Sequence, residues 1–418
     1  MIQIVTAIRS LLLGMGIFLA GSGLLGTLLG LRAGEEGFSE AVIGLVMSAF
    51  FIGYILGSYF CPKLIRRVGH IRTFAVMAAI SCVVALLHGL FVDPYVWWIL
   101  RIINGMSILG LYMVIESWLN EQITHYRGQI FGIYMTVSLL ALGAGQFLIV
   151  AYGPNELASF ALVAILFAIG LLPIALTRTA QPTPIATDSL SLRTLFKKAP
   201  VGAAGALISG FVTGTFWGMS AVFAHALGMS NTLIATFIAL TILGGALLQW
   251  PLGKLSDNRD RRQVLSWIAL AGAGTVLLFP LLDSVSVTAF MTAALLYGGF
   301  SFSLYSISVA QTHDRLSKGQ VLEGTRGLLM LNGIGASIGP MMTGLVMQLL
   351  GSHGFPVMLA ATLVGLVIFI QWRMRVDRPV PETERGEFVL VTRTSAVAAD
   401  LDPRTHPEQE LELEVPPK

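Results

Sequence analysis

Twelve long apolar runs constrain the fold of this chain more than any other feature of its sequence. Each run holds about 20 predominantly apolar residues, which is the length that a helix needs to cross a bilayer. The runs are continuous and rich in Leu, Ala and Gly, whereas the strands of a membrane barrel would show short alternating segments. The sequence therefore predicts an all-α membrane protein with twelve transmembrane helices, at Ser10–Leu31, Ala41–Pro62, Thr73–Val92, Tyr95–Ile115, Gln129–Ala151, Leu157–Leu176, Val201–His225, Thr232–Leu252, Val264–Leu282, Val285–Gln311, Gly327–Leu350 and Gly354–Trp372.

The composition excludes a soluble protein of the same length. Only 12% of the residues are charged and 55% are hydrophobic, whereas an average soluble protein has about 25% charged residues. The 45 glycines suit closely packed membrane helices. The two cysteines, Cys61 and Cys82, lie inside apolar runs, so no disulfide framework is expected.

Lysine and arginine gather in the connections on one side of the predicted membrane. The opposite connections hold one arginine, Arg32, among several acidic residues. Because positively charged loops stay in the cytoplasm, the pattern predicts a multi-pass protein of the inner (plasma) membrane with both termini cytoplasmic. The basic connections follow the even-numbered runs and hold Lys63, Arg66, Arg67, Arg72, Arg127, Lys254, Arg259, Arg261, Arg262, Arg315 and Lys318.

The runs divide into two groups of six. Residues 1–177 are expected to form an N-terminal six-helix bundle and residues 201–373 a C-terminal one, with residues 178–200 as a polar cytoplasmic linker. Six runs, a linker and six runs indicate an internal duplication. Residues 374–418 are rich in charge and proline and are expected to form a disordered cytoplasmic tail.

Short basic turns occupy the same place in each half and carry a family resemblance. The turn from Gly253 to Arg262 resembles the Gly-x-x-x-Asp-Arg-x-Gly-Arg-Arg loop of the major facilitator superfamily at Gly253, Asp257, Arg261 and Arg262. Asn258 and Asp260 depart from that pattern. The first copy keeps fewer positions: it matches at Arg67 and Gly69 and has Pro62 and Arg66 where Gly and Asp are expected.

Two further motifs extend the resemblance over residues 1 to about 373. Arg101-Ile-Ile-Asn-Gly105 in run four is similar to the Arg-x-x-Gln-Gly element, and Gly335-x-x-x-Gly339-Pro340 in run eleven is similar to the Gly-x-x-x-Gly-Pro element. The strings from Ile115 to Glu121 and from Arg66 to Arg72 resemble the YcaD-like bacterial branch. The resemblance implies the major facilitator fold and a secondary transporter, with a central cavity lined by runs one, four, seven and ten.

Arg101 is the candidate for coupling, because a charge inside a span is costly and is a functional candidate by default. It lies about 9 Å, at 1.5 Å per residue, from the Tyr95 end of its run. It would lower the pKa of a protonatable partner or bind an anionic substrate. The alternative is a structural donor that snorkels toward neighbouring carbonyls.

Glu116 lies fifteen residues after Arg101, or about 22 Å along the helix, so the two cannot pair directly. We expect Glu116 to meet Arg66, Arg67 or Arg127 in a gating ion pair; a proton carrier and a plain interface charge are the alternatives. We interpret Asp257 and its neighbour Arg261 as gating residues too, and we expect Asp257 to pair across the two halves.

The expected cavity residues are large amphipathic, hydroxyl or amide side chains. With no clustered charge beyond Arg101, such walls favour amphipathic or weakly polar solutes. Individual hydroxyls would alternatively satisfy backbone groups. The candidates are Asn104, Tyr112, Thr213, Trp217, Tyr297 and Tyr305, with Gln146 and Asn332 either lining the cavity or bridging helices.

These observations predict a secondary active transporter that moves a small organic solute by alternating access. Coupling to protons and efflux are favoured, with uptake by proton symport as the alternative. A non-transporting receptor or scaffold with this fold, holding partners through its acidic tail, is the hypothesis from a different class. No metal-ligand spacing, phosphate-binding loop or nucleotide domain is present, so we expect neither an enzyme nor a cofactor or metal. We expect a monomer in the lipid bilayer with no nucleic-acid partner.

Overall fold

The computed structural model describes residues 2–122, 127–176, 190–283, 285–391, 394, 395 and 397. Within these ranges twelve helices of 17 to 34 residues form two bundles, which confirms the all-α prediction. The first bundle holds α1 (Ile2–Glu35), α2 (Glu40–Val68), α3 (His70–Leu90), α4 (Pro94–Gln122), α5 (Arg127–Gln146) and α6 (Leu157–Ala175), and the second holds α8 (Pro200–Ala226), α9 (Asn231–Leu255), α10 (Arg261–Leu277), α12 (Val287–His313), α13 (Val321–Leu350) and α14 (Gly354–Val376).

Shorter elements connect the long helices. Two are α-helical, α7 (Leu192–Lys198) and α11 (Phe279–Leu282), and four are 3₁₀ turns, η1 (Phe147–Val150), η2 (Lys318–Gln320), η3 (Gly351–His353) and η4 (Glu382–Glu384). Residues 177–189, which include most of the predicted linker, lie outside the described part of the chain.

The described helices form eleven stretches that are long and apolar enough to cross a membrane. The last one, Val321–Val376, contains both α13 and α14, because only the turn at Gly351–His353 separates them. The outward faces expose large apolar side chains, among them Leu247, Trp250 and Ile368. Such surfaces fit lipid rather than water.

Polar caps set where several helices begin. The side chains of Ser39, Ser230 and Ser286 each accept a hydrogen bond from the backbone N–H three residues on, and Asp260 accepts one from the N–H of Arg262. These caps satisfy backbone donors that the first helical turn leaves without partners. Many helices extend past the predicted apolar runs, because helical hydrogen bonding continues into the polar connections.

Glycine lets the helices within each bundle pack at very short range. A Cβ atom on Gly53 would overlap the backbone of Ile102, and one on Gly105 would overlap the backbone of Phe50, so α2 and α4 are in backbone contact. Gly244 and Gly298 do the same for α9 and α12. Small residues at helix contacts are the usual means of association in a bilayer, where the hydrophobic effect between helices is absent.

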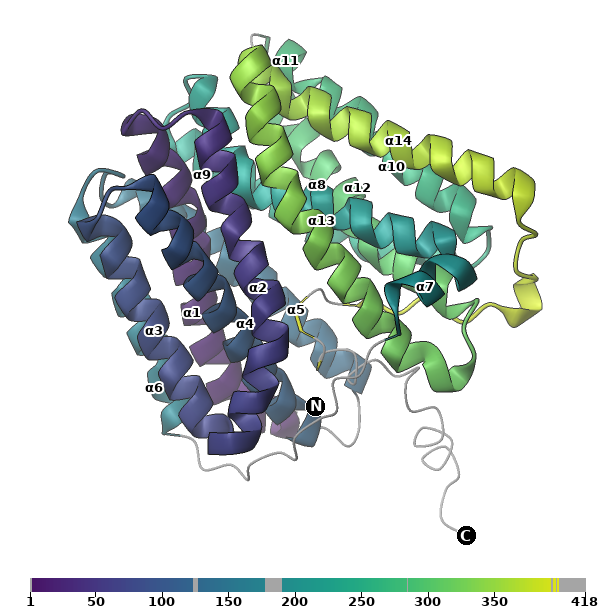
Figure 1. Cartoon of the computed structure of the whole chain (residues 1–418), viewed down its shortest axis with the longest axis horizontal. Helices are drawn as coiled ribbons and strands as arrows, with labels where there is room; N and C mark the ends of the chain where they lie inside the picture. The colour runs from purple at the N-terminus through teal and green to yellow at the C-terminus, as the bar shows by residue number, and fades with distance from the viewer. Residues whose placement is uncertain are drawn as a thin grey trace.

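The two bundles lie side by side (Figure 1) and meet most closely near one membrane face. We call the face that carries the α2–α3 and α9–α10 turns the basic face and the other the opposite face. Near the opposite face α2 and α13 are in contact, where a Cβ on Gly44 would overlap the carbonyl oxygen of Pro340 and lie 3.1 Å from the Cα of Gly344. A Cβ on Gly30 of α1 would lie 3.4 Å from Ala221 of α8. The bundles are therefore closed against each other at the opposite face.

Replacement of Gly44 by valine should prevent this closure. Overpacking of a tight contact costs about 1–3 kcal/mol, so the population open to the opposite face should rise at least about fivefold. The measurement is the rate at which a membrane-impermeant thiol reagent, added at the opposite face, labels a cysteine introduced by Ser22→Cys in a Cys61→Ser, Cys82→Ser background.

Gly274→Val is the matched control, because a Cβ at Gly274 meets nothing within 4 Å. Equal labelling rates in the Gly44→Val and Gly274→Val proteins would show that the contact between α2 and α13 does not close the opposite face.

Candidate substrate cavity

One cavity of about 430 Å³ lies between the two bundles. Its lining reaches Lys63 and Arg66, both exposed at the end of α2, so the cavity opens toward the basic face. It lies within the size range of ligand pockets, about 300–1,000 Å³. Closed at the opposite face and open at the basic face, the molecule has the geometry of one state of an alternating-access cycle.

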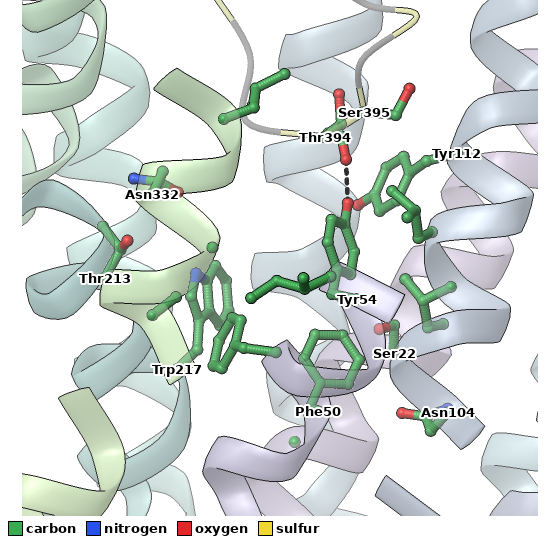
Figure 2. Close-up of a pocket in the computed structure, with 18 of the residues that line it drawn as sticks. Ser22, Phe50, Tyr54, Asn104, Tyr112, Thr213, Trp217, Asn332, Thr394 and Ser395 are labelled. Atoms are coloured by element: carbon green, nitrogen blue, oxygen red, sulfur yellow. Dashed lines mark hydrogen bonds between the residues drawn. The ribbon is translucent and has the colours of Figure 1, made fainter. Parts of the chain in front are cut away.

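Six of the eight expected cavity residues line this space. They are Asn104, Tyr112, Gln146, Thr213, Trp217 and Asn332. Figure 2 shows Thr213, Trp217 and Asn332 on one side of the cavity, and Phe50, Tyr54 and Tyr112 on the other. Both bundles therefore contribute to one lining. A role of these residues in substrate binding stays a prediction.

Tyr297 and Tyr305 do not line the cavity, and that expectation was wrong. Both are fully buried within the second bundle, where the Tyr297 ring packs edge-on against Phe279 with centroids 5.8 Å apart. The Tyr305 side chain is part of a buried apolar cluster with Leu195, Ala206 and Leu328. The lining contribution of α12 is Phe302.

Helices α2 and α13 line the cavity more extensively than the sequence analysis expected. The aromatic side chains Phe50, Tyr54 and Tyr59 of α2 face it, together with Leu329 and Met330 of α13. Phe50 and Tyr54 are four residues apart, and their ring centroids are 5.9 Å apart. This i, i+4 aromatic spacing is the signal in the sequence that could have identified them.

Two of the expected amides also bridge helices, so both interpretations of them hold. Gln146 accepts a hydrogen bond from the hydroxyl of Thr27 in α1 and donates to the carbonyl oxygen of Leu142. The Nδ2 of Asn332 donates to the carbonyl oxygen of Ala206 in α8 at 3.2 Å.

Arg101 lines the cavity as a buried cation with a relative exposure of 6%. Its guanidinium carbon lies 4.6 Å from the centroid of the Phe50 ring, and its Nη1 lies 3.5 Å from the Oδ1 of Asn104. Across the described ranges it forms no ion pair with a carboxylate. The Nε of Arg101 and the Nδ2 of Asn104 are buried without a hydrogen-bond partner.

Glu116 is fully buried and is held by hydroxyl groups. The hydroxyl of Tyr134 donates to its Oε1 at 2.6 Å, and the hydroxyl of Ser395 donates to its Oε2. The expected pairing with Arg66 or Arg67 was wrong: both are exposed and form no ion pair with any described residue. The side chain of Arg127, the third expected partner, lies outside the described part of the structure.

The basic turn before α10 is tied together within the second bundle. Arg261 lies 3.2 Å from Asp257 and 2.7 Å from Asp314, and it donates to the Oγ of Ser256 at 2.8 Å. Burial raises the pKa of Asp314, while the Arg261 guanidinium opposes that shift. Asp257 also contacts Lys254 at 3.5 Å. In this state Asp257 pairs within the second bundle, and its gating contact across the two halves stays a prediction.

The segment after α14 returns to the cavity, although disorder was expected from residue 374. Arg261 donates to the carbonyl oxygen of Gly386, and Asp257 accepts a hydrogen bond from the N–H of Phe388 at 2.8 Å. The Phe388 ring packs against Gly253. In Figure 1 this segment (yellow) leaves the end of α14 and runs back toward α5.

The described residues that follow contact both bundles. Ser306 donates to the carbonyl oxygen of Val391 at 3.3 Å, and Tyr54 donates to the carbonyl oxygen of Thr394 (Figure 2). Thr394 and Ser395 line the cavity, and no signal in the sequence indicated this. Residues 398–418 of the predicted tail lie outside the described part of the chain.

Comparison with known proteins gives consistent matches over nearly the whole chain. The profile of the Major Facilitator Superfamily matches residues 11–322 and 202–401. The uncharacterized MFS-type transporter YcaD of Escherichia fergusonii is 26% identical over 377 residues, which cover 88% of this chain and 97% of that protein. The protein of the same name from Salmonella arizonae is 27% identical over 347 residues, covering 82% and 89% of the two chains.

Solved structures share the fold at low sequence identity. The nucleoside transporter NupG superposes with a TM-score of 0.72 at 14% identity and covers 87% of this chain and 98% of its own. A bacterial homologue of the human lysosomal transporter Spinster, in an inward-facing and unoccupied conformation, has a TM-score of 0.63 at 14% identity, with 99% of both chains covered. The resemblance found in the sequence motifs is confirmed, and this family consists of transporters rather than enzymes. The chain belongs to the Major Facilitator Superfamily.

Proposed function

We propose that this transporter exports a small amphipathic organic solute by alternating access, in exchange for protons. The observation that carries the proposal is the cavity that both bundles line, closed at the opposite face and open at the basic face. A rocking motion that separates Gly44 from Pro340 and brings the basic-face ends together would present the same lining residues to the other side.

The basic face is assigned to the cytoplasm. Lys63, Arg66, Arg67 and Arg72 lie at its α2–α3 turn, and positively charged connections are retained on the cytoplasmic side. The described state is then open to the cytoplasm, and both termini lie there. A solute would enter from the cytoplasm and leave through the opposite face.

The cavity lining supports an amphipathic solute. Trp217 and Phe302, with ring centroids 6.3 Å apart, and Phe50 and Tyr54 provide aromatic walls. Hydroxyl and amide groups between them provide hydrogen bonds that orient a ligand without demanding multiple charges.

Glu116 supports proton coupling. A carboxylate inside a span is costly when ionised. Glu116 is fully buried next to Ser395 of the cavity lining, within electrostatic range of Tyr54 and Tyr112, which also line the cavity. The hydroxyl groups of Tyr134 and Ser395 each donate a hydrogen bond to one carboxylate oxygen of Glu116, and both oxygens accept such bonds when the carboxylate is ionised. Loss of the Ser395 contact as the mouth closes would change the stability of the ionised form, so proton uptake would follow the conformational change.

Glu116→Gln should therefore abolish proton-coupled movement of solute, because the amide of glutamine does not take up or release a proton near neutral pH. The measurement uses proteoliposomes with an imposed pH gradient and a pH-sensitive dye inside. A panel of neutral, cationic and anionic aromatic solutes is added, and protein-free vesicles correct for passive permeation. At least one solute should dissipate the gradient with the unmodified protein and none should do so with Glu116→Gln.

The matched control is Glu156→Gln, which removes an exposed carboxylate between η1 and α6. It should behave as the unmodified protein. If Glu116→Gln dissipates the gradient as fast as Glu156→Gln, then Glu116 does not carry the coupled proton. If the solute moves in the same direction as the protons rather than in the opposite direction, the protein is a symporter and not an exporter that exchanges solute for protons.

A further inference from the structure

We propose that Arg101 and Asn104 form a subsite for a carboxylate group of the transported solute. This proposal rests on the proposed function and names the chemical class of its substrate: an aromatic or otherwise apolar molecule that carries one carboxylate.

Among the described residues the charge of Arg101 has no counter-ion. Its side chain is more than nine-tenths buried, and the described part of the chain places no carboxylate within ion-pair distance. Burial of a cation without an opposite charge is strongly unfavourable. The Phe50 ring, 4.6 Å from the guanidinium carbon, offsets only part of this cost through a cation–π interaction. A ligand anion would supply what the chain does not.

Two buried donors beside this charge have no partner among the described residues. The Nε of Arg101 and the Nδ2 of Asn104 have no hydrogen-bond partner. The two residues are three apart on α4 and so share one helix face, and both line the cavity. A carboxylate has two coplanar oxygens and is the group that a guanidinium fork binds with paired, charge-assisted hydrogen bonds.

The surroundings of this subsite fit the rest of such a solute. Phe50 and Trp217 line the same cavity and would contact an apolar ring. Lys63 and Arg66 stand at its entrance and carry the same sign of charge as Arg101. Cations that line a cleft raise the local concentration of anions and would attract this class of solute from the basic face.

The test compares matched pairs of ligands that differ only in the charged group: benzoate with benzamide, and 2-naphthoate with 2-naphthamide. Binding to the purified full-length protein is measured by titration calorimetry. The carboxylates should bind at least about tenfold more tightly than the amides, as expected for charge-assisted hydrogen bonds. In Arg101→Gln this preference should disappear, and the affinity for the amides should stay within about twofold.

Arg72→Gln is the matched control, because it removes an exposed positive charge from the same basic face at a residue outside the described cavity lining. It should keep the preference for carboxylates. The proposal is overturned if the unmodified protein shows no preference in either pair, or if Arg101→Gln keeps it. Because binding is measured without transport, a chain that binds carboxylates but moves no solute would contradict the proposed function and leave this subsite standing.

A different set of contacts carries a second proposal. We infer that residues 386–391, with Thr394 and Ser395, form an autoinhibitory plug, which occupies the basic-face mouth of the cavity and must leave before that mouth can close. Its described residues contact both bundles: Phe388 at Gly253 and Val391 at Ser306 on one side, and Thr394 at Tyr54 on the other.

These contacts have a direct consequence for the cycle. Closure of the basic face brings the two bundles together at the place where Thr394 and Ser395 now lie, so the plug and the closed state exclude each other. The plug is a short segment that packs between helices of the two bundles. A few hydrogen bonds and the Phe388 ring hold it, so a small change in these contacts would release it.

The test measures access to the mouth in two variants that weaken the plug at different elements. Phe388→Ala removes the ring, and Gly253→Ala places a Cβ where the ring lies. In both, a cysteine introduced by Ser58→Cys at the cavity wall, in the Cys61→Ser, Cys82→Ser background, should react with an impermeant maleimide at least about fivefold faster, corresponding to about 1 kcal/mol of lost contact.

Glu384→Ala, an exposed residue of η4, is the control and should leave the rate unchanged. Thermal unfolding of each variant verifies that the bundles are intact. Unchanged reactivity in both Phe388→Ala and Gly253→Ala would overturn the plug.

Discussion

The close contact between α2 and α13 is the interaction on which the account of this transporter depends. Gly44 of one bundle meets Pro340 and Gly344 of the other at backbone distance. A bilayer supplies no hydrophobic driving force between helices, so shape complementarity between small residues has to hold the bundles together. Such a contact is favourable only when it is fully made, which makes two discrete states of the interface easier to populate than a continuum.

The two charges inside α4 lie at different depths, Arg101 in the lining of the cavity and Glu116 buried next to Ser395 of that lining. Arg101 and Glu116 share α4, but fifteen residues separate them, and each has its own surroundings. The guanidinium packs on Phe50 and faces the cavity with free donors, whereas the carboxylate is surrounded by hydroxyl groups near the mouth. One helix therefore carries both a candidate site for the solute and a candidate site for the proton. Movement of α4 would affect both sites together, which is the requirement for coupling.

The features that sequence could predict are those that a local pattern determines. Twelve apolar runs indicate twelve helices because each run alone meets the length requirement of a bilayer. The rotation of a helix about its axis is different. Apolar and hydroxyl residues occur all round α12, so no stripe marks the face that meets the cavity. Tyr297 and Tyr305 were therefore expected in the lining, although both are buried inside the bundle. On α4 the rare polar residues Arg101 and Asn104 marked the cavity face correctly, because a bilayer leaves such groups no other place.

Contacts between segments far apart in the chain could not be predicted. Glu116 was expected to meet the nearest arginines, but Tyr134 and Ser395 hold it. Ser395 lies in a segment whose composition alone is typical of disorder, and its position depends on the Phe388 ring and on Arg261, which binds the Gly386 carbonyl. Composition averages over many residues, so it cannot indicate that the Phe388 ring packs against Gly253.

The most direct test of alternating access is a pair of distances measured in the same protein under the same conditions. Spin labels at Glu36 and Leu349 report the separation of the bundles at the opposite face, and labels at Arg67 and Asn258 report it at the basic face; all four positions are exposed. The account predicts two populations in which a short distance at one face accompanies a long distance at the other. Distances that lengthen together at both faces, or a basic-face distance that never shortens under any solute or pH gradient, would contradict it.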